Sequence, residues 1–130
     1  MVFPEVVPIT IEILRAGDSG EWGTHLFFDD DVLVGNGGWK GAPIDGVAEL
    51  GYAVAPDYRG RGIATAAVRT LVARADEAGV RLVIAHTLAD SSPSTSVLTA
   101  CGFTNVGEIV DPDDGRIWRW ELPRPPRDAS

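Results

Sequence analysis

Apolar and polar residues along this 130-residue chain change their spacing twice, and each change marks a different kind of element. Alternating or continuous apolar stretches predict strands at 24–29, 32–39 and 47–54, separated by turns rich in Asp, Pro and Gly. Because short turns join antiparallel neighbours, these three strands predict a meander. Residues 9–16 fit two patterns: Ile9, Ile11 and Ile13 alternate with polar residues, whereas Leu14 to Gly17 resembles a capped helix end. We favour a short helix there.

The spacing becomes helical after residue 60. Apolar residues three and four apart, several alanines and a closing Gly79 predict a helix over 61–78. A nearly all-apolar strand at 81–87 follows, and then a helix at 93–101 with Ser92 as its N-cap and Pro93 in its first position. Strands at 103–110 and 116–122, joined by Asp-Pro-Asp-Asp-Gly, predict a closing hairpin.

This order of elements predicts the fold class. The strand–helix–strand unit from 47 to 87 predicts a right-handed parallel crossover, and the remaining neighbours are expected to be antiparallel. The result is an α/β (α+β) fold with a mixed, mostly antiparallel sheet flanked by helices. No linker divides the chain, so we expect one domain over 1–130, with 1–8 and 123–130 irregular because prolines interrupt them.

Charge and composition exclude several classes of partner. The net charge of −8, from 11 Lys and Arg against 19 Asp and Glu, repels a phosphate backbone, so we expect no nucleic acid partner. No stretch approaches the roughly 20 apolar residues of a membrane span, and the N-terminus has no basic leader, so we expect no membrane partner. The single Cys101 fits a reducing, cytoplasmic compartment. No Cys/His cluster has metal-ligand spacing, so no metal is expected.

The chemistry concentrates in the turn Arg59-Gly60-Arg61-Gly62-Ile63-Ala64, between a predicted strand and a predicted helix. Its glycines let a ligand approach the backbone, and the free N–H groups and dipole of a helix N-terminus attract an anion. A Walker A loop is excluded because Gly-Lys-Ser/Thr is absent. A dinucleotide fingerprint is excluded because Thr65 stands where its third Gly or Ala belongs. A plain strand-to-helix turn stays an alternative.

Three segments together resemble a known family. Arg59-x-x-Gly62-x-Ala64 resembles the Gln/Arg-x-x-Gly-x-Gly/Ala signature of the GCN5-related N-acetyltransferase (GNAT) superfamily. The stretch 49–56 resembles the family's fourth strand, and Ser94-x-x-Val97-Leu98-x-x-Cys-Gly-Phe resembles its later helix. The most similar branch contains the ribosomal-protein N-terminal acetyltransferases.

The resemblance implies a GNAT-like fold and an acetyl-CoA-dependent enzyme. Acetyl-coenzyme A would be the cosubstrate, and the acceptor would be a primary amine of a small molecule or of a protein N-terminus. The nitrogen would attack the acetyl group directly. A non-catalytic coenzyme A-binding module is the alternative, and a structural domain with a Gly-rich turn is a third.

The resemblance also implies binding roles for individual residues. Backbone groups of Val54 and Ala55 would hold the pantetheine arm, with the Val54 N–H near the acetyl carbonyl. The pyrophosphate would be held by the backbone N–H groups of Arg59, Gly60, Arg61, Gly62, Ile63 and Ala64. Ser91 and Ser94 would bind pantetheine or a water molecule.

Acid–base groups are harder to assign. Glu49 is the leading candidate for the base that deprotonates the amine, and a structural ion pair is its alternative. His86 is a second candidate, although a rim histidine is its more ordinary interpretation, and His25 is a weaker one. The Tyr that many family members use as acid corresponds to Leu98, so Ser96 becomes the candidate acid.

The early part of the chain differs from the family, which begins with a strand and two helices before the first hairpin. Only about 23 residues precede the hairpin here, so we expect the first strand and first helix to be absent or truncated. Apolar sheet surface would then be exposed, and we expect a homodimer partner or the segment 2–14 to cover it. Core packing is expected for Trp118 and Trp120, which share one side of a strand, and an acceptor-site role is a second option for Trp39.

Overall fold

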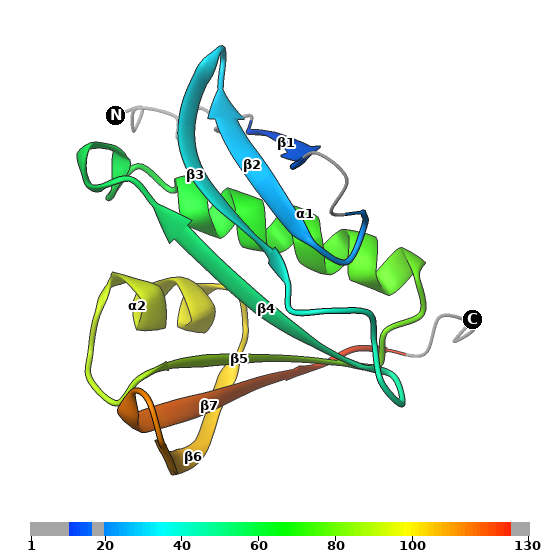
Figure 1. Cartoon of the computed structure of the whole chain (residues 1–130), viewed down its shortest axis with the longest axis vertical. Coiled ribbons are helices and arrows are strands. Elements are labelled where there is room, and N and C mark those ends of the chain that lie inside the picture. The colour runs from blue at the N-terminus through cyan, green and yellow to red at the C-terminus, as the bar shows by residue number, and fades with distance from the viewer. Residues whose placement is uncertain (1–10, 17–19, 126–130) are drawn as a thin grey trace, which may run out of the picture.

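The computed structural model describes residues 11–16 and 20–125, which form one seven-stranded sheet and two α-helices (Figure 1). The strands are β1 (Glu12–Arg15), β2 (Thr24–Asp29), β3 (Val32–Trp39), β4 (Val47–Val54), β5 (Leu82–Leu88), β6 (Thr104–Asp111) and β7 (Gly115–Pro123). The helices are α1 (Ile63–Glu77) and α2 (Pro93–Ala100), and a 3-10 turn, η1, spans Pro56–Tyr58. Neither α-helix is long and apolar enough to cross a membrane.

The strands lie in the order β1-β2-β3-β4-β5-β7-β6. The β4 and β5 strands are parallel, and every other neighbouring pair is antiparallel. The parallel pair is connected through α1, as the chain order requires for a strand–helix–strand unit. The predicted crossover, the closing hairpin and the mixed, mostly antiparallel sheet are therefore confirmed.

The first described element is a strand, so the predicted short helix at 9–16 is wrong. Ile13 is 6% exposed and Leu14 is 46% exposed, which is the alternation of a strand with one covered face. Ile13 pairs with Phe27, and the Ala16 N–H continues the ladder by donating to the Thr24 carbonyl at 3.0 Å. The first strand, expected to be absent or truncated, is thus present with four residues, and no helix lies between β1 and β2 among the described residues. The segment 1–8 and the residues beyond 125 lie outside the described part of the chain.

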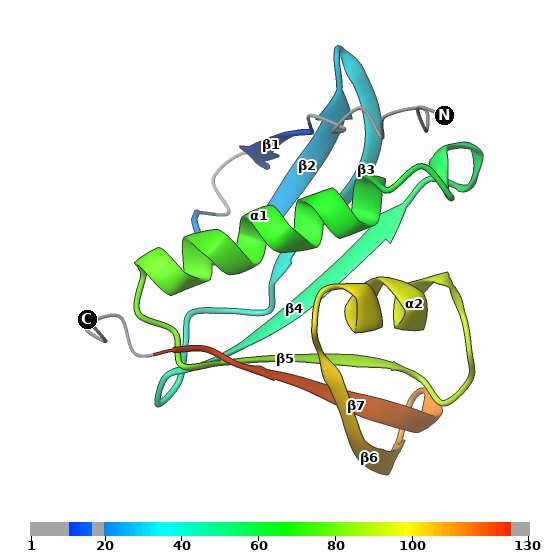
Figure 2. The same cartoon turned by 180° about the vertical axis from the view of Figure 1, so that it is seen from behind.

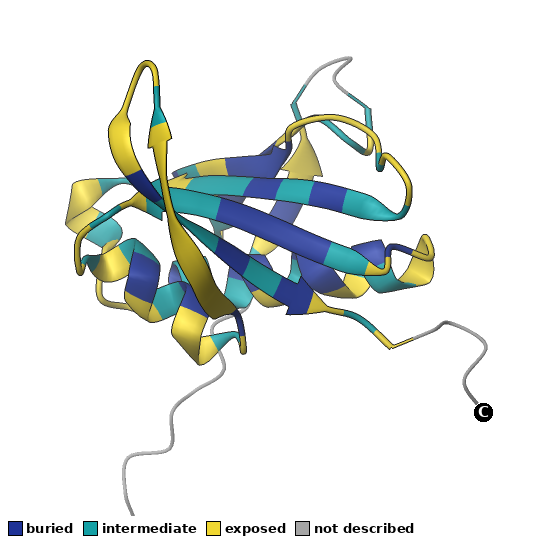
Figure 3. Ribbon diagram, turned by 90° about the horizontal axis from the view of Figure 1, so that it is seen from below, coloured by how far each residue is buried: buried dark blue, intermediate teal, exposed yellow. Residues whose placement is uncertain are grey.

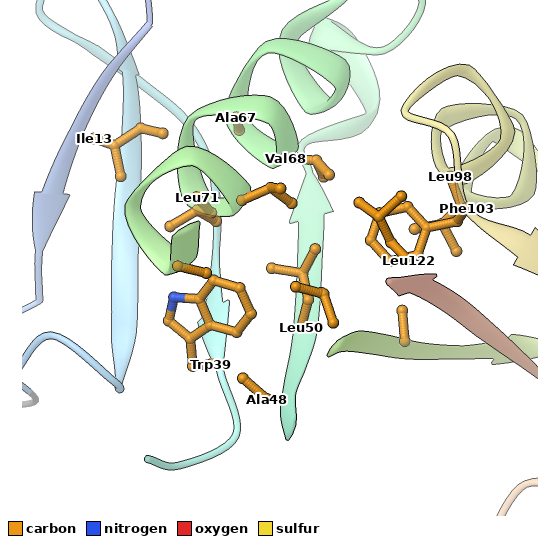
Figure 4. Close-up of a cluster of buried hydrophobic side chains, with 14 of the residues drawn as sticks. Ile13, Trp39, Ala48, Leu50, Ala67, Val68, Leu71, Leu98, Phe103 and Leu122 are labelled. Carbon is orange, nitrogen blue, oxygen red and sulfur yellow. The ribbon is translucent and has the colours of Figure 1, made fainter. Parts of the chain in front are cut away.

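Both helices cover the same face of the sheet (Figures 2 and 3). The register places Leu50 of β4, Ala85 of β5 and Trp120 of β7 in one row, and all three are buried. Figure 4 shows side chains of α1, including Val68 and Leu71, directed toward Leu50, while Leu98 of α2 packs beside Leu122. The opposite face carries no helix within the described residues, and Glu49 and His86 lie on it by alternation.

Aromatic pairs belong to the covered face. The rings of Trp118 and Trp120 lie 6.3 Å apart, which confirms that they share one side of β7. Trp39 is 6% exposed, and its ring lies 5.6 Å from that of Trp22. Because Trp39 is part of the core beneath α1, the acceptor-site option for this residue is wrong (Figure 4).

Candidate functional site

The site begins where β4 and β5 separate. Their pairing ends at Leu50 and Ala85, although β4 continues to Val54 and β5 to Leu88. Figures 1 and 2 show the two strands adjacent at one end and diverging toward the other, where α2 lies. Beyond Leu50, the backbone groups of β4 that point toward β5 therefore form no ladder hydrogen bonds with β5.

The phase of the β3–β4 ladder decides which backbone groups these are. The Ala55 N–H donates to the Val34 carbonyl at 2.8 Å, and hydrogen-bonded positions alternate along an antiparallel pair. The N–H and C=O groups of Tyr52 and Val54 therefore point away from β3 and toward the gap. Ala55 differs from the expectation, because its carbonyl accepts from the Tyr58 N–H at 2.9 Å and both of its backbone groups are thus engaged within the protein.

A cleft of about 590 Å³ opens on the helix-covered side of this gap. Its walls come from β4, from the turn before α1, from the first turn of α1 and from α2. The lining residues are Tyr52, Ala53, Val54, Tyr58, Arg59, Gly60, Gly62, Ile63, Ala64, Thr65, Pro93, Ser94, Ser96, Val97 and Ala100. The cleft has the size of a small-molecule site and brings together segments that are 48 residues apart in the chain.

The turn before α1 presents backbone N–H groups to the cleft. Gly60 and Gly62 have φ angles of 77° and 80°, a left-handed conformation that glycine adopts without strain. The N–H of Ala66 donates to the Gly62 carbonyl at 3.0 Å, and the N–H groups of residues 60–65 have no backbone acceptor among the described residues. A Cβ added at Gly60 would meet no atom within 4 Å, so this position is open. The turn therefore has the geometry of an anion cradle.

Two arginines flank the cradle. The Arg59 Nε donates to the Val54 carbonyl at 3.1 Å, which fixes the guanidinium across the gap end of β4. Its terminal N–H groups stay available to an anion. The Arg61 guanidinium lies 5.2 Å from the centre of the Tyr58 ring, so Arg61 is held by a cation–π contact beside the turn rather than in the cleft lining.

The other wall is the start of α2. Ser92 and Thr95 form a capping box there, which fixes the helix N-terminus. Ser94 and Ser96 line the cleft, whereas Ser91 is exposed and lies outside the lining.

Tyr52 connects the two walls, although the sequence pattern predicts no role for this residue. Its hydroxyl donates to the Ser94 carbonyl at 3.0 Å, and burial raises its pKa well above the ordinary range of a phenol. Tyr52 therefore stays protonated over the physiological pH range. Tyr52 lies two residues before Val54 on β4, so the two residues share one side of the strand. This spacing could have identified Tyr52 as a site residue from the sequence.

Glu49 and His86 lie on the other face of the sheet, away from the cleft lining. The His86 Nδ1 is 3.1 Å from the Glu49 Oε2, and both side chains are partly exposed. The Lys40 Nζ lies 4.0 Å from the same carboxylate oxygen. The pair lies beside the point where the pairing of β4 with β5 ends. The structure thus places the two expected titratable candidates in direct contact.

Three other residues have structural roles. Leu98 is fully buried, so no hydroxyl is available at the position where many family members have a Tyr. The Cys101 Sγ lies 3.8 Å from the Thr65 carbonyl, and burial raises the pKa of this thiol. His25 is 1% exposed, and its Nδ1 lies 3.1 Å from the Gly23 carbonyl, so it belongs to the core. Among the described residues, no group of three His, Cys, Asp or Glu side chains is placed to hold a metal ion.

The sequence matches one protein family. The model of the acetyltransferase (GNAT) domain matches residues 9–104, which include β1 to α2 and all the cleft residues. No protein with a curated description matches the sequence.

Solved structures share the fold at low sequence identity. Ribosomal-protein-S5-alanine acetyltransferase from Vibrio fischeri is 18% identical with a TM-score of 0.71, over 82% of this chain and 62% of that one. The ribosomal L7/L12 alpha-N-protein acetyltransferase RimL in complex with coenzyme A is 19% identical with a TM-score of 0.72, over 78% and 61%. Microcin C7 self immunity acetyltransferase MccE in complex with acetyl-CoA and AMP is 18% identical with a TM-score of 0.71, over 78% and 60%. The chain thus spans about three fifths of these structures.

Proposed function

The chain belongs to the GNAT acetyltransferase family, and from this premise we propose that it transfers an acetyl group from acetyl-coenzyme A to a primary amine. The observation that carries the proposal is the cradle of N–H groups at residues 60–65, which opens into the cleft beside the β4–β5 gap. Two of the similar structures contain coenzyme A or acetyl-CoA.

The geometry fits the parts of this cosubstrate. A pyrophosphate needs several N–H donors and positive charge, and the turn offers both through its backbone and Arg59. A pantetheine arm carries amide groups that can extend a sheet, and the N–H of Val54 and the backbone of Tyr52 face the unpaired side of β4. Ser94 and Ser96 supply polar groups on the facing wall. Ser91 and Ala55 are not placed for these contacts.

The acetyl group would lie at the gap, with Glu49 on the far side of the sheet. We propose that Glu49 serves the deprotonation of the amine, because an ammonium has no lone pair for attack. Ser96 remains the proposed donor to the departing sulfur, since it lines the cleft and is exposed. We propose a small molecule or a protein N-terminus as the acceptor. The open face of the sheet supports this proposal because it leaves Glu49 accessible.

A thiol-release assay tests the proposal. The full chain is incubated with acetyl-CoA and a panel of amines: peptides with N-terminal Ser or Ala, spermidine, and an aminoglycoside. We expect release of free thiol with at least one amine, and a loss of roughly 100-fold or more in kcat for Glu49→Gln. Binding of acetyl-CoA without transfer to any amine would favour a non-catalytic coenzyme A-binding module instead.

We also propose that a second copy of the chain covers the β1 end of the open face and leaves Glu49 and His86 uncovered. Leu14 of β1 lies at this end and is 46% exposed. Sedimentation velocity at tens of micromolar tests the proposal, for which we expect a dimer. A monomer at that concentration would contradict it.

A further inference from the structure

The contact between Glu49 and His86 fixes the state of the imidazole. A carboxylate oxygen only accepts hydrogen bonds, so the His86 Nδ1 at 3.1 Å must carry the proton of that bond. In the neutral ring the other nitrogen, Nε2, then holds a free lone pair. No described residue forms a hydrogen bond with this Nε2. A carboxylate that orients a histidine in this way leaves the distal nitrogen ready to accept a proton.

The register places His86 closer to the β4–β5 gap than Glu49. Glu49 is opposite Ile84, one pair before the last paired residues, Leu50 and Ala85. His86 is the first residue of β5 beyond that pair. The imidazole therefore lies where the two strands begin to separate, and the carboxylate lies one pair further into the paired part of the sheet.

We propose that His86 is the catalytic residue that takes the proton from the acceptor ammonium, and that Glu49 is the positioning residue behind it. This inference rests on the proposed acetyl transfer. The ammonium N–H bond breaks and its proton goes to the His86 Nε2, while the Glu49 carboxylate stabilises the imidazolium. The freed nitrogen lone pair forms the C–N bond to the acetyl carbon.

The remaining bonds balance with no further reactant. The C–S bond breaks with its electron pair going to sulfur. Ser96 donates its hydroxyl proton to that sulfur, which leaves as a thiol, and Ser96 regains a proton from the one that the nitrogen then loses. The imidazolium returns its proton to the solvent. One proton is released for each amide formed, and no oxidant or metal is needed.

Each of the other charged groups near the pair lies beside a group of opposite charge. Arg119 is opposite His86 on β7, but its Nε donates to the Glu121 Oε2 at 3.0 Å. Lys40 approaches Glu49 from the end of β3, with its Nζ 4.0 Å from the carboxylate. Glu121 shares the row of Glu49 and Ile84 and lies on the same face, where it engages Arg119 rather than the imidazole.

The first test requires no acceptor. The chain has two histidines, so nitrogen-15 NMR at pH above 8 resolves both rings. We expect His86 to be the tautomer with Nδ1 protonated and Nε2 bare. The opposite tautomer would overturn the inference, because the carboxylate would then orient no basic nitrogen toward the gap.

The second test measures kcat and KM against pH with acetyl-CoA and the best amine of the panel. We expect His86→Gln to lower kcat by about 100-fold or more and to abolish the acidic limb of the profile, with KM for acetyl-CoA within about twofold. Glu49→Gln should lower kcat too, and the double variant should be no slower than His86→Gln alone, as for groups that act as a unit. Glu108→Gln is the control and should behave as wild type, because Glu108 is a carboxylate on β6 that pairs with Arg116 and contacts neither His86 nor the cleft.

The outcomes separate the inference from the proposed function. If His86→Gln keeps the wild-type kcat and acidic limb while acetyl transfer proceeds, the role of His86 is refuted and the proposed function stands. If the two single losses multiply in the double variant, the pair does not act as a unit and the inference fails. Absence of transfer to every amine would refute the proposed function and the inference together.

Discussion

The hydroxyl of Tyr52 on β4 donates to the carbonyl of Ser94 on α2 at 3.0 Å, and this hydrogen bond joins the two walls of the cleft. The two residues are 42 positions apart, so the bond closes a long loop of chain around the site. It lies where β4 and β5 have already separated, and it therefore fixes the position of α2 at the open end of the sheet.

Tyr52→Phe should loosen this connection without changing the shape of the wall. One hydroxyl is lost and the half-buried Ser94 carbonyl loses its donor, so we expect the free energy of unfolding to fall by about 1 kcal/mol. Because burial raises the pKa of Tyr52, its phenol is a poor proton donor to a thiolate. We therefore expect kcat to fall by less than about tenfold, below the usual general-acid effect. Urea unfolding and steady-state kinetics measure the two effects, and a kcat loss of several hundredfold would instead identify Tyr52 as the acid.

Arg59→Gln should weaken acetyl-CoA binding. The substitution removes a cation beside the N–H cradle, and a lost charged hydrogen bond corresponds to at least about a tenfold increase in Kd. The affinity of the variant should also depend less on salt. Arg116→Gln is the control, because Arg116 is an exposed cation on β7 that pairs with Glu108 far from the lining of the cleft. Equal loss of affinity in both variants would mean that Arg59 acts only through the net charge of the protein.

His25 should make the stability of the fold depend on pH. Burial lowers the pKa of His25 below the ordinary value of 6.5, and its hydrogen bond to the Gly23 carbonyl only partly opposes this effect. His25 therefore binds a proton more readily in the unfolded chain than in the folded chain. The free energy of unfolding should consequently fall as the pH drops below 6.5. Denaturant titrations at pH 7.5, 6.5 and 5.5 measure this dependence. His86→Gln should retain it, whereas equal stability at the three pH values would contradict the assignment.

Gly60→Ala should separate binding from folding. Gly60 and Gly115 have φ angles of 77° and 74°, and a Cβ at either would meet no atom within 4 Å, so both alanine variants should lose about 1–2 kcal/mol through backbone strain alone. Only Gly60 lines the cleft, whereas Gly115 is the first residue of β7. We expect Gly60→Ala to weaken acetyl-CoA binding and Gly115→Ala to leave it unchanged. Thermal unfolding and calorimetry give both quantities for each variant.

Most elements follow from local patterns. The strands at 24–29, 32–39 and 47–54 match the structure because their alternation and turn residues agree with each other. A cap signal predicts a short helix at 9–16, but pairing with β2 buries Ile13 and makes 12–15 a strand. That pairing is a tertiary effect, and local propensity does not contain it.

The candidate site follows from the sequence only in part. Gly60, Gly62 and Arg59 are adjacent in the chain, so their shared position at the cleft could be read from the sequence. The contact of Glu49 with His86 depends on the register of two parallel strands that are far apart in the sequence. The hydrogen bond from the Ala55 N–H to the Val34 carbonyl likewise depends on the register of β3 and β4. A shift of one residue would turn these backbone groups to the other side of the strand.

The central claim is that the cleft beside the β4–β5 gap binds acetyl-coenzyme A. Isothermal titration of acetyl-CoA into the full wild-type chain, in a buffer without phosphate, tests it most directly. We predict a saturable heat for one site per chain, with a Kd in the range of about 1–100 μM and a matching rise in melting temperature. No saturable heat and no shift in melting temperature at millimolar acetyl-CoA would contradict the claim.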